Sequence, residues 1–328
     1  MTDPHGCAFD GCCPRRNTGV RLIDPRMPEL ARCLTLFRYV QAVTGGPVAR
    51  IDQAGSYAVP TLRGEPFAVR PGTITLRLDA ERVSTAVVAR EEGSVLVRLL
   101  DGEGRTAHEG RLLSDGDRLL AGLARTVEAG AVPGEASRAR ATPDEEASRA
   151  PEASDGEAGS PARGTGTPVG GSAPVWEYGD QLAQLDAVLA DGGVARRAAF
   201  GRYRGEHREV EAGLVSAVLD HVCSVGLPIG VAVFAPAAMQ ACAGRVHVTD
   251  RTVGGRVFAA LADSSVEIDL ADVRACHLVR STAAHGPTSA LELDDADGRC
   301  VAVLTQFGIV GEQVHRAWED LTASLPDA

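Results

Sequence analysis

The sequence predicts an α+β protein of two duplicated domains, each a large antiparallel β-sheet with helices packed at its ends. Three observations support this fold class. Apolar and polar residues alternate in many short runs, as in strands with one buried face. Helical patterns precede and follow these runs instead of alternating with them. Two apolar runs joined by an Asp–Gly turn occur twice, at 95–113 and at 289–308.

The composition is that of a globular protein with two domains of ordinary size. The chain has 328 residues, of which 44% are hydrophobic, and a net charge of −11. This charge argues against nucleic-acid binding, because neutralising phosphates needs a basic surface. No run approaches the ~20 apolar residues of a membrane span, and the first residues hold no apolar signal-peptide core. We therefore expect a cytoplasmic protein without a nucleic-acid partner or membrane insertion.

Composition divides the chain into four parts. Residues 1–19 are expected to form a disordered tail. Residues 127–175 are rich in Pro, Gly, Ser, Ala and Glu, and such a segment cannot bury enough apolar surface to offset its chain entropy. We interpret it as a disordered linker. The first repeat is then expected over 20–126 and the second over 176–328.

The repeated turn is the strongest sign of an internal repeat. Asp101, Gly104 and Arg105 recur with the same spacing as Asp295, Gly298 and Arg299. Repetition over this length indicates duplicated domains and not a solenoid.

Each half is expected to begin and end with helical segments around its strands. A helix is predicted over 28–37 in the first half and over 178–200 in the second, where Leu182, Leu185 and Val188 share one face. Closing helices are expected at 114–127 and 312–325. The strands of the second half are predicted at 227–236, 244–250, 257–262, 265–270, 274–280, 288–295 and 300–307.

The second half resembles the HemS/ChuX-type haemin-degrading and haem-transport proteins. The resembling stretches follow the order and spacing of that family's motifs; they are Pro228–Phe234, Gln240–Val246, His277–Thr282, Thr288–Gly298 and Phe307–Gly308. The first half matches more loosely, through 74–83 and 99–113. The resemblance implies a HemS-like pair of repeats that handles haem for iron acquisition, by intracellular transport or by haemin degradation. It also implies haem as cofactor, with a haem importer or a reductase as possible partners.

The chain departs from the family pattern at the expected haem contacts. The resemblance implies a ligating His on the helix that opens the second repeat, and this position is Ala183, which has no lone pair for iron. The family's distal Arg falls on Val95, and Arg98, three residues on, would lie on the other face of the strand. An Arg is kept at Arg196 and at Arg280.

The predicted haem site lies between helix 177–200 and the second sheet. Arg196 and Arg280 are the candidates for pairing with the propionates, and Phe307 for contact with the ring. Tyr178 or His207 is the candidate axial ligand of the haem iron. For each of these residues a surface or packing role is the alternative.

The sequence leaves open whether the protein is an enzyme, because no Ser/His/Asp or Cys/His arrangement is visible and no catalytic residue can be named. Haem could also be held weakly, by Arg and apolar contacts alone. The alternative function is a non-catalytic binding or interaction protein that kept the HemS-like fold but lost haem ligation. His108, inside a predicted strand, is expected to be a half-buried structural residue.

Overall fold

The computed structural model describes residues 20–23, 27–70, 72–91, 94–116, 181–191, 207–252, 254–283, 286–307 and 310–328. The expected tail and linker lie outside these residues, as does the predicted closing helix of the first half beyond residue 116. None of the described helices is long and apolar enough to span a membrane.

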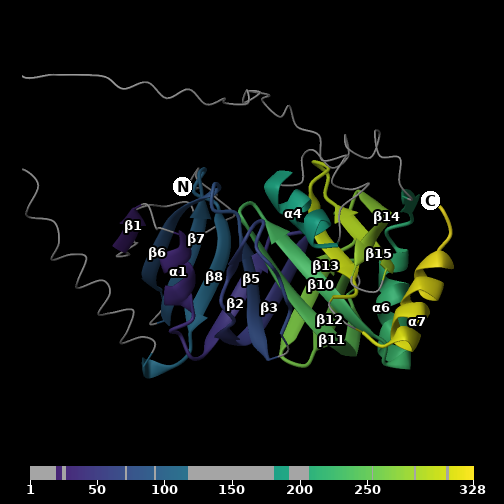
Figure 1. Cartoon of the computed structure of the whole chain (residues 1–328), viewed down its shortest axis with the longest axis horizontal. Coiled ribbons are helices and arrows are strands. Elements are labelled where there is room, and N and C mark those ends of the chain that lie inside the picture. The colour runs from purple at the N-terminus through teal and green to yellow at the C-terminus, as the bar shows by residue number, and fades with distance from the viewer. Residues whose placement is uncertain are drawn as a thin grey trace, which may run out of the picture.

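The described elements of the first half are one helix and eight strands (Figure 1). They are β1 (Val20–Ile23), α1 (Met27–Leu34), β2 (Val40–Gly45), β3 (Ala49–Tyr57), β4 (Thr61–Leu62), β5 (Thr73–Leu78), β6 (Val83–Glu91), β7 (Ser94–Asp101) and β8 (Thr106–Leu112).

The second half contains three described helices and eight strands (Figure 1). They are α4 (Gln181–Asp191), β9 (His207–Val210), α6 (Leu214–Val225), β10 (Pro228–Ala235), β11 (Ala238–Arg251), β12 (Arg256–Leu261), β13 (Ser264–Asp269), β14 (Ala275–Ala283), β15 (Gly286–Asp294), β16 (Cys300–Thr305) and α7 (Glu312–Ala323).

This architecture confirms the predicted α+β class with large antiparallel sheets. The seven strands predicted for the second half correspond to β10 to β16, and α7 ends within two residues of its expected end. β11 begins six residues earlier than its predicted start at 244, because the pairing of β11 with β10 continues back to Ala238.

The two halves are joined by a reciprocal exchange of strands. The strands follow the order β1-β6-β7-β8-β2-β3-β13-β12-β11-β10-β16-β15-β14-β9, with β4 and β5 off this path. β13 of the second half pairs antiparallel with β3 of the first, where Val266 lies opposite Ile51. β5 of the first half pairs antiparallel with β11 of the second, where Leu76 lies opposite Gln240. Each half therefore completes the sheet of the other.

The turn between β7 and β8 is built by an Asp side chain. Asp101 Oδ1 accepts the backbone N–H groups of Glu103 and Arg105 at 2.9 and 2.8 Å. The N–H of Gly104 donates to the carbonyl of Asp101 at 3.0 Å. Gly104 has a φ of 77°, which is a left-handed conformation that glycine adopts without steric cost.

The turn between β15 and β16 repeats these contacts. Asp295 Oδ1 accepts the N–H groups of Asp297 and Arg299, both at 2.9 Å. The N–H of Gly298 donates to the carbonyl of Asp295 at 2.9 Å, and Gly298 has a φ of 73°. The sequence motif that occurs twice therefore builds the same turn twice.

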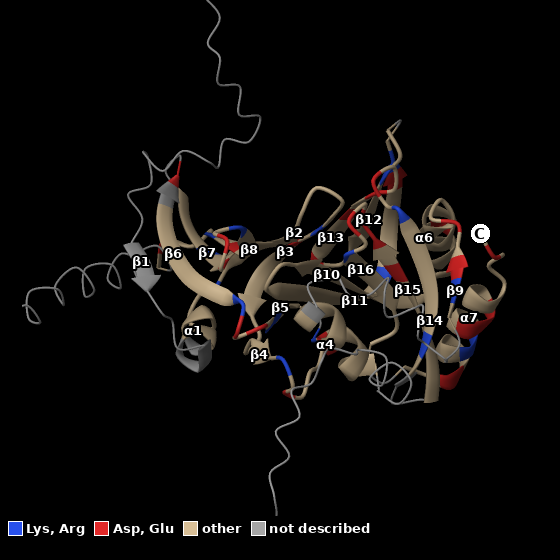
Figure 2. Cartoon of the chain, turned by 90° about the horizontal axis from the view of Figure 1, so that it is seen from above, with Lys and Arg blue, Asp and Glu red and all other residues tan. Residues whose placement is uncertain are grey.

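Helices cover both faces of the sheet in the second half. α6 and α7 pack on one face, where Val218, Leu219 and Trp318 join the largest apolar cluster. α4 packs on the other face through Leu185 and Val188. In Figure 2, α4 and α7 lie on opposite sides of β14 and β15. The first half has its own core, to which α1 contributes.

A buried chain of hydrogen bonds crosses the junction of the halves. The Thr44 hydroxyl donates to Gln240 Oε1 at 2.9 Å, and Gln240 Nε2 donates to Gln53 Oε1 at 3.3 Å. His108 contacts Thr44 through Nδ1 and the Tyr57 hydroxyl through Nε2, both at 2.7 Å. Because the Thr44 hydrogen is already used, His108 Nδ1 is the donor and Nε2 accepts from Tyr57.

His108 is fully enclosed and uncharged. It is only 1% exposed, which is deeper than the half-buried position expected from the sequence, and both of its ring nitrogens take part in the hydrogen-bond chain. Burial lowers the pKa of His108 to about 3 and raises the pKa of Tyr57 above its usual value. Both groups are therefore neutral at physiological pH.

The protein should lose stability in mild acid because of His108. The folded state binds no proton at His108 between its lowered pKa of about 3 and the usual 6.5, whereas the unfolded chain does. The contribution of neutral His108 to the free energy of unfolding is complete above pH 6.5 and is lost as the pH falls towards 3. We expect a loss of about 2 kcal/mol in the free energy of unfolding between pH 8 and pH 5, measured by urea denaturation.

His108→Gln should flatten this slope, and the exposed control His221→Gln should not. Equal slopes in all three proteins would contradict the assignment.

Candidate functional site

An ion pair between a fully buried arginine and a partly buried aspartate fixes α4 to the first half of the chain. The fully buried Arg77 of β5 donates from Nη2 and Nε to Asp186 of α4, at 2.7 and 2.5 Å. Arg77 also donates to Thr61 Oγ1 at 3.0 Å and lies over the Phe67 ring, 5.4 Å from its centroid. A bidentate guanidinium–carboxylate pair fixes both distance and orientation. The position of α4 on the second sheet is therefore set by a residue of the first half.

α4 meets the sheet partly through amides. Gln181 Nε2 donates to Thr305 Oγ1 at 2.8 Å, and Gln184 Nε2 donates to the buried carboxylate of Glu292 at 2.6 Å. Ala183 lies between these two residues and is half-buried. α4 itself contains no His, Cys, Tyr or Met. It therefore offers no side chain that commonly ligates haem iron.

Phe307 lies on the face of the sheet that α4 covers. Its ring packs over Gly230 of β10, where an added Cβ would meet the Phe307 ring at 2.2 Å. The ring also meets Phe67 edge-on, with 6.4 Å between centroids. Both rings pack against the apolar cluster that includes Leu185 of α4. Phe307 is thus part of an aromatic wall beside α4.

Arg280 and His207 border a different hollow, which we call the α7 hollow. It has a volume of about 410 Å³ and is lined by His207, Arg208, Leu278, Arg280, Ser289, Glu319 and Ala323. Arg280 Nη2 lies 3.5 Å from Glu319 of α7, and Ser289 donates to the same carboxylate at 2.8 Å. Arg208 donates to the carbonyl of Thr322 at 3.1 Å.

The structure does not bring all the predicted haem residues together. Arg280 contacts α7 on one face of the sheet, whereas Phe307 packs on the face that α4 covers. A flat ligand between α4 and the sheet could contact Phe307 but not Arg280. Arg196 and Tyr178 lie outside the described residues. The haem roles of all these residues remain predictions.

The first-half position that corresponds to the family's distal Arg lies inside a core, where no ligand reaches it. Val95 is buried in the first core. Arg98 pairs instead with Glu91 and Glu109, both at 2.6 Å. Within the described residues, no cluster of three or more His, Cys, Asp or Glu could hold a metal ion.

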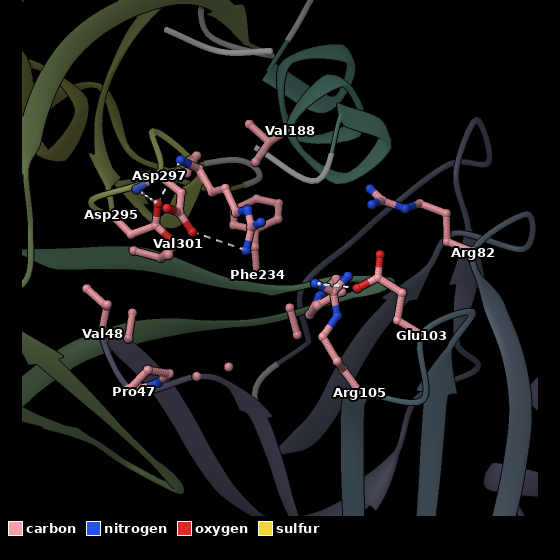
Figure 3. Close-up of a pocket in the computed structure, with 17 residues that line it drawn as sticks. Pro47, Val48, Arg82, Glu103, Arg105, Val188, Phe234, Asp295, Asp297 and Val301 are labelled. Atoms are coloured by element: carbon pink, nitrogen blue, oxygen red, sulfur yellow. Dashed lines mark hydrogen bonds and ion pairs between the residues drawn. The ribbon is translucent and has the colours of Figure 1, made fainter. Parts of the chain in front are cut away.

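A second cavity lies where the two repeated turns meet, and we call it the central cavity (Figure 3). Its volume is about 440 Å³. Arg105 and Glu103 enter it from the β7–β8 turn, and Asp297 and Arg299 from the β15–β16 turn. Its other lining residues are Gly45, Gly46, Pro47, Val48, Ala49, Arg82, Val188, Phe234, Ala235, Pro236, Asp295, Cys300 and Val301.

The central cavity and Arg208 were not predicted from the sequence. The repeated Asp–Gly–Arg turn was the available signal for the cavity, because equivalent turns of a duplicated fold can meet at its symmetry axis. Arg208 is adjacent to the predicted His207, but its approach to α7 depends on the pairing of β9 with β14.

Comparison with solved structures confirms the HemS-like fold. ChuS, an Escherichia coli haem oxygenase, matches with a TM-score of 0.68 and 16% identity, over 94% of this chain and 88% of that chain. Holo-PhuS, a haem-binding protein from Pseudomonas aeruginosa, matches with a TM-score of 0.64 and 19% identity, over 94% and 87% of the two chains. No family model and no curated protein matches the sequence. At these identities the likeness establishes the fold.

Removing the carboxylate that fixes α4 should strongly destabilise the protein. Asp186→Ala leaves the buried charge of Arg77 without its partner, a change that typically costs about 3–5 kcal/mol. Urea denaturation measures the loss. Asp220→Ala is the matched control because it removes a pair with Arg251 on the surface, where we expect a loss of about 1 kcal/mol or less. Similar losses in both variants would contradict the role of Asp186.

Proposed function

We propose that this chain is a cytoplasmic haem-handling protein of iron acquisition. The observation that carries the proposal is the whole-chain fold likeness to haem-binding PhuS and to the haem oxygenase ChuS. The likeness spans both halves and is not limited to one module. The resembling sequence motifs of the second half support the same proposal independently.

The α7 hollow is lined by an imidazole, two guanidinium groups and apolar surface, which are groups of the kinds that bind haem. The His207 imidazole is a suitable axial ligand for haem iron. The guanidinium groups of Arg208 and Arg280 line the same hollow and suit the two propionates. Leu278 and Ala323 add apolar surface. Among the described residues, the α4 face offers the Phe307 ring but no comparable ligand from α4 itself.

The proposal includes two modes, carriage of intact haem and degradation of haem. Bound haem would supply the oxygen-activating iron, while this chain would hold, orient and shield it. In the degrading mode a reductase would deliver electrons. In the carrying mode a haem importer would deliver the haem. Ascorbate in air distinguishes the modes, because a degraded haem loses its Soret band and a carried haem keeps it.

Ala183 favours a second candidate function, which is a non-catalytic interaction protein that kept the fold and lost haem. The position where the resemblance implies an iron ligand carries a methyl group. In this alternative the arginines of the α7 hollow serve ion pairs such as the one between Arg280 and Glu319.

Haemin titration distinguishes the two functions. If haem binds in the α7 hollow, the full chain should give a sharp Soret band that saturates at one equivalent. His207→Ala should shift this band and weaken binding at least tenfold, because the iron loses its ligand. Arg280→Gln should weaken binding about tenfold, which is the loss expected for one charge-assisted contact.

Two substitutions of the same types serve as controls. His221→Ala and Arg256→Gln change exposed residues outside the α7 hollow and should leave the titration unchanged. A broad, non-saturating spectrum in the wild-type protein would refute haem handling. If His207→Ala and Arg280→Gln both saturate like the wild-type protein, the chain binds haem at a site other than the α7 hollow.

A further inference from the structure

The central cavity is formed by equivalent parts of the two halves. The β7–β8 and β15–β16 turns carry the same backbone hydrogen bonds and end in Arg105 and Arg299. The β2–β3 connection contributes Gly46 and Pro47, and the end of β10 with the β10–β11 connection contributes Ala235 and Pro236. The two equivalent turns therefore place one guanidinium from each half at the cavity.

Each of the two arginines has one exposed carboxylate neighbour, and Arg105 has a buried one as well. Arg105 Nε donates to the buried Asp101 carboxylate at 2.7 Å, and Arg105 Nη1 lies 3.0 Å from Glu103. Arg299 Nη1 lies 3.6 Å from Asp297. The side chains of Glu103 and Asp297 are 72% and 68% exposed. Ion pairs this exposed contribute about 0–1 kcal/mol each. Another anion can therefore replace Glu103 or Asp297 at little cost, while the contact between Arg105 Nε and Asp101 stays in place.

The third arginine of the cavity has a separate role. Arg82 Nη1 donates to the carbonyls of Leu189 and Ala190, at 3.4 and 3.1 Å. These carbonyls belong to the last turn of α4, where a positive charge is favourable. Arg82 thus supports the helix and leaves Arg105 and Arg299 as the pair that can receive a ligand.

Part of the cavity wall is apolar. Val188 of α4 and Phe234 of β10 project into the cavity, and Val48 and Val301 line it (Figure 3). Apolar walls with a few placed charges are typical of small-molecule sites. Such walls favour a ligand with a hydrocarbon middle over a small inorganic ion.

We propose that the central cavity binds a small organic dicarboxylate. One carboxylate pairs with Arg105 and displaces Glu103, and the other pairs with Arg299 and displaces Asp297. The hydrocarbon middle lies against Val188 and Phe234. This site is distinct from the α7 hollow and does not depend on haem.

Calorimetric titration of the full chain with succinate, adipate and suberate, in a carboxylate-free buffer, tests the proposal. We expect saturable one-to-one binding whose affinity depends on chain length, and at least tenfold weaker binding of acetate, which can pair with only one arginine. Arg105→Gln and Arg299→Gln should each weaken the best ligand about tenfold.

A gain of affinity provides the second test, because misfolding cannot produce it. Glu103→Gln removes the competing carboxylate and should tighten binding about threefold. Arg256→Gln is the control, since Arg256 pairs with Glu267 and Asp269 away from the cavity, and it should change nothing. The proposal is overturned if none of the three dicarboxylates saturates, if Arg256→Gln weakens binding as much as Arg105→Gln, or if Glu103→Gln leaves the affinity unchanged. Stoichiometric displacement of the dicarboxylate by haemin would also overturn it, because the cavity would then be a haem site.

Discussion

The reciprocal pairing of β5 with β11 and of β13 with β3 is the constraint on which the rest of the structure depends. A sheet edge presents unpaired backbone groups, and each half of this chain closes its edge with a strand of the other. The halves are therefore not independent modules joined by a tether. The hydrogen-bond chain from His108 through Thr44 to Gln240 runs across this same junction, and it satisfies polar groups that would otherwise be buried without partners.

This junction also decides where ligands can bind. Arg77 sits on the exchanged strand β5, and through Asp186 it determines how α4 lies on the second sheet. The central cavity opens where the equivalent turns of the two halves meet. The α7 hollow, by contrast, is built within the second half alone. A substitution in the α7 hollow therefore affects contacts within the second half only. A substitution in the central cavity affects contacts of both halves.

Much of the fold was predictable from local patterns, and the site was less so. Alternating runs gave the strands of the second half, and the repeated Asp–Gly–Arg motif gave two equivalent turns, because both depend on neighbours along the chain. The face on which Arg280 lies depends on its pairing opposite Ser289, which is a contact between strands. The partner of Asp186 is a residue of the other half. Neither contact produces a periodic pattern in the sequence. Arg280 and Phe307 were therefore predicted to share one haem site, although the two residues lie on opposite faces of the sheet.

The exchanged strands have a consequence for synthesis on the ribosome. β3 is complete at Tyr57, but its partner β13 begins only at Ser264. At typical translation rates this delay lasts roughly ten to forty seconds. During that time the nascent first half carries an open edge that could pair with the wrong chain. A chaperone that shields emerging β-strands would therefore raise the yield of folded protein more than one that acts after release.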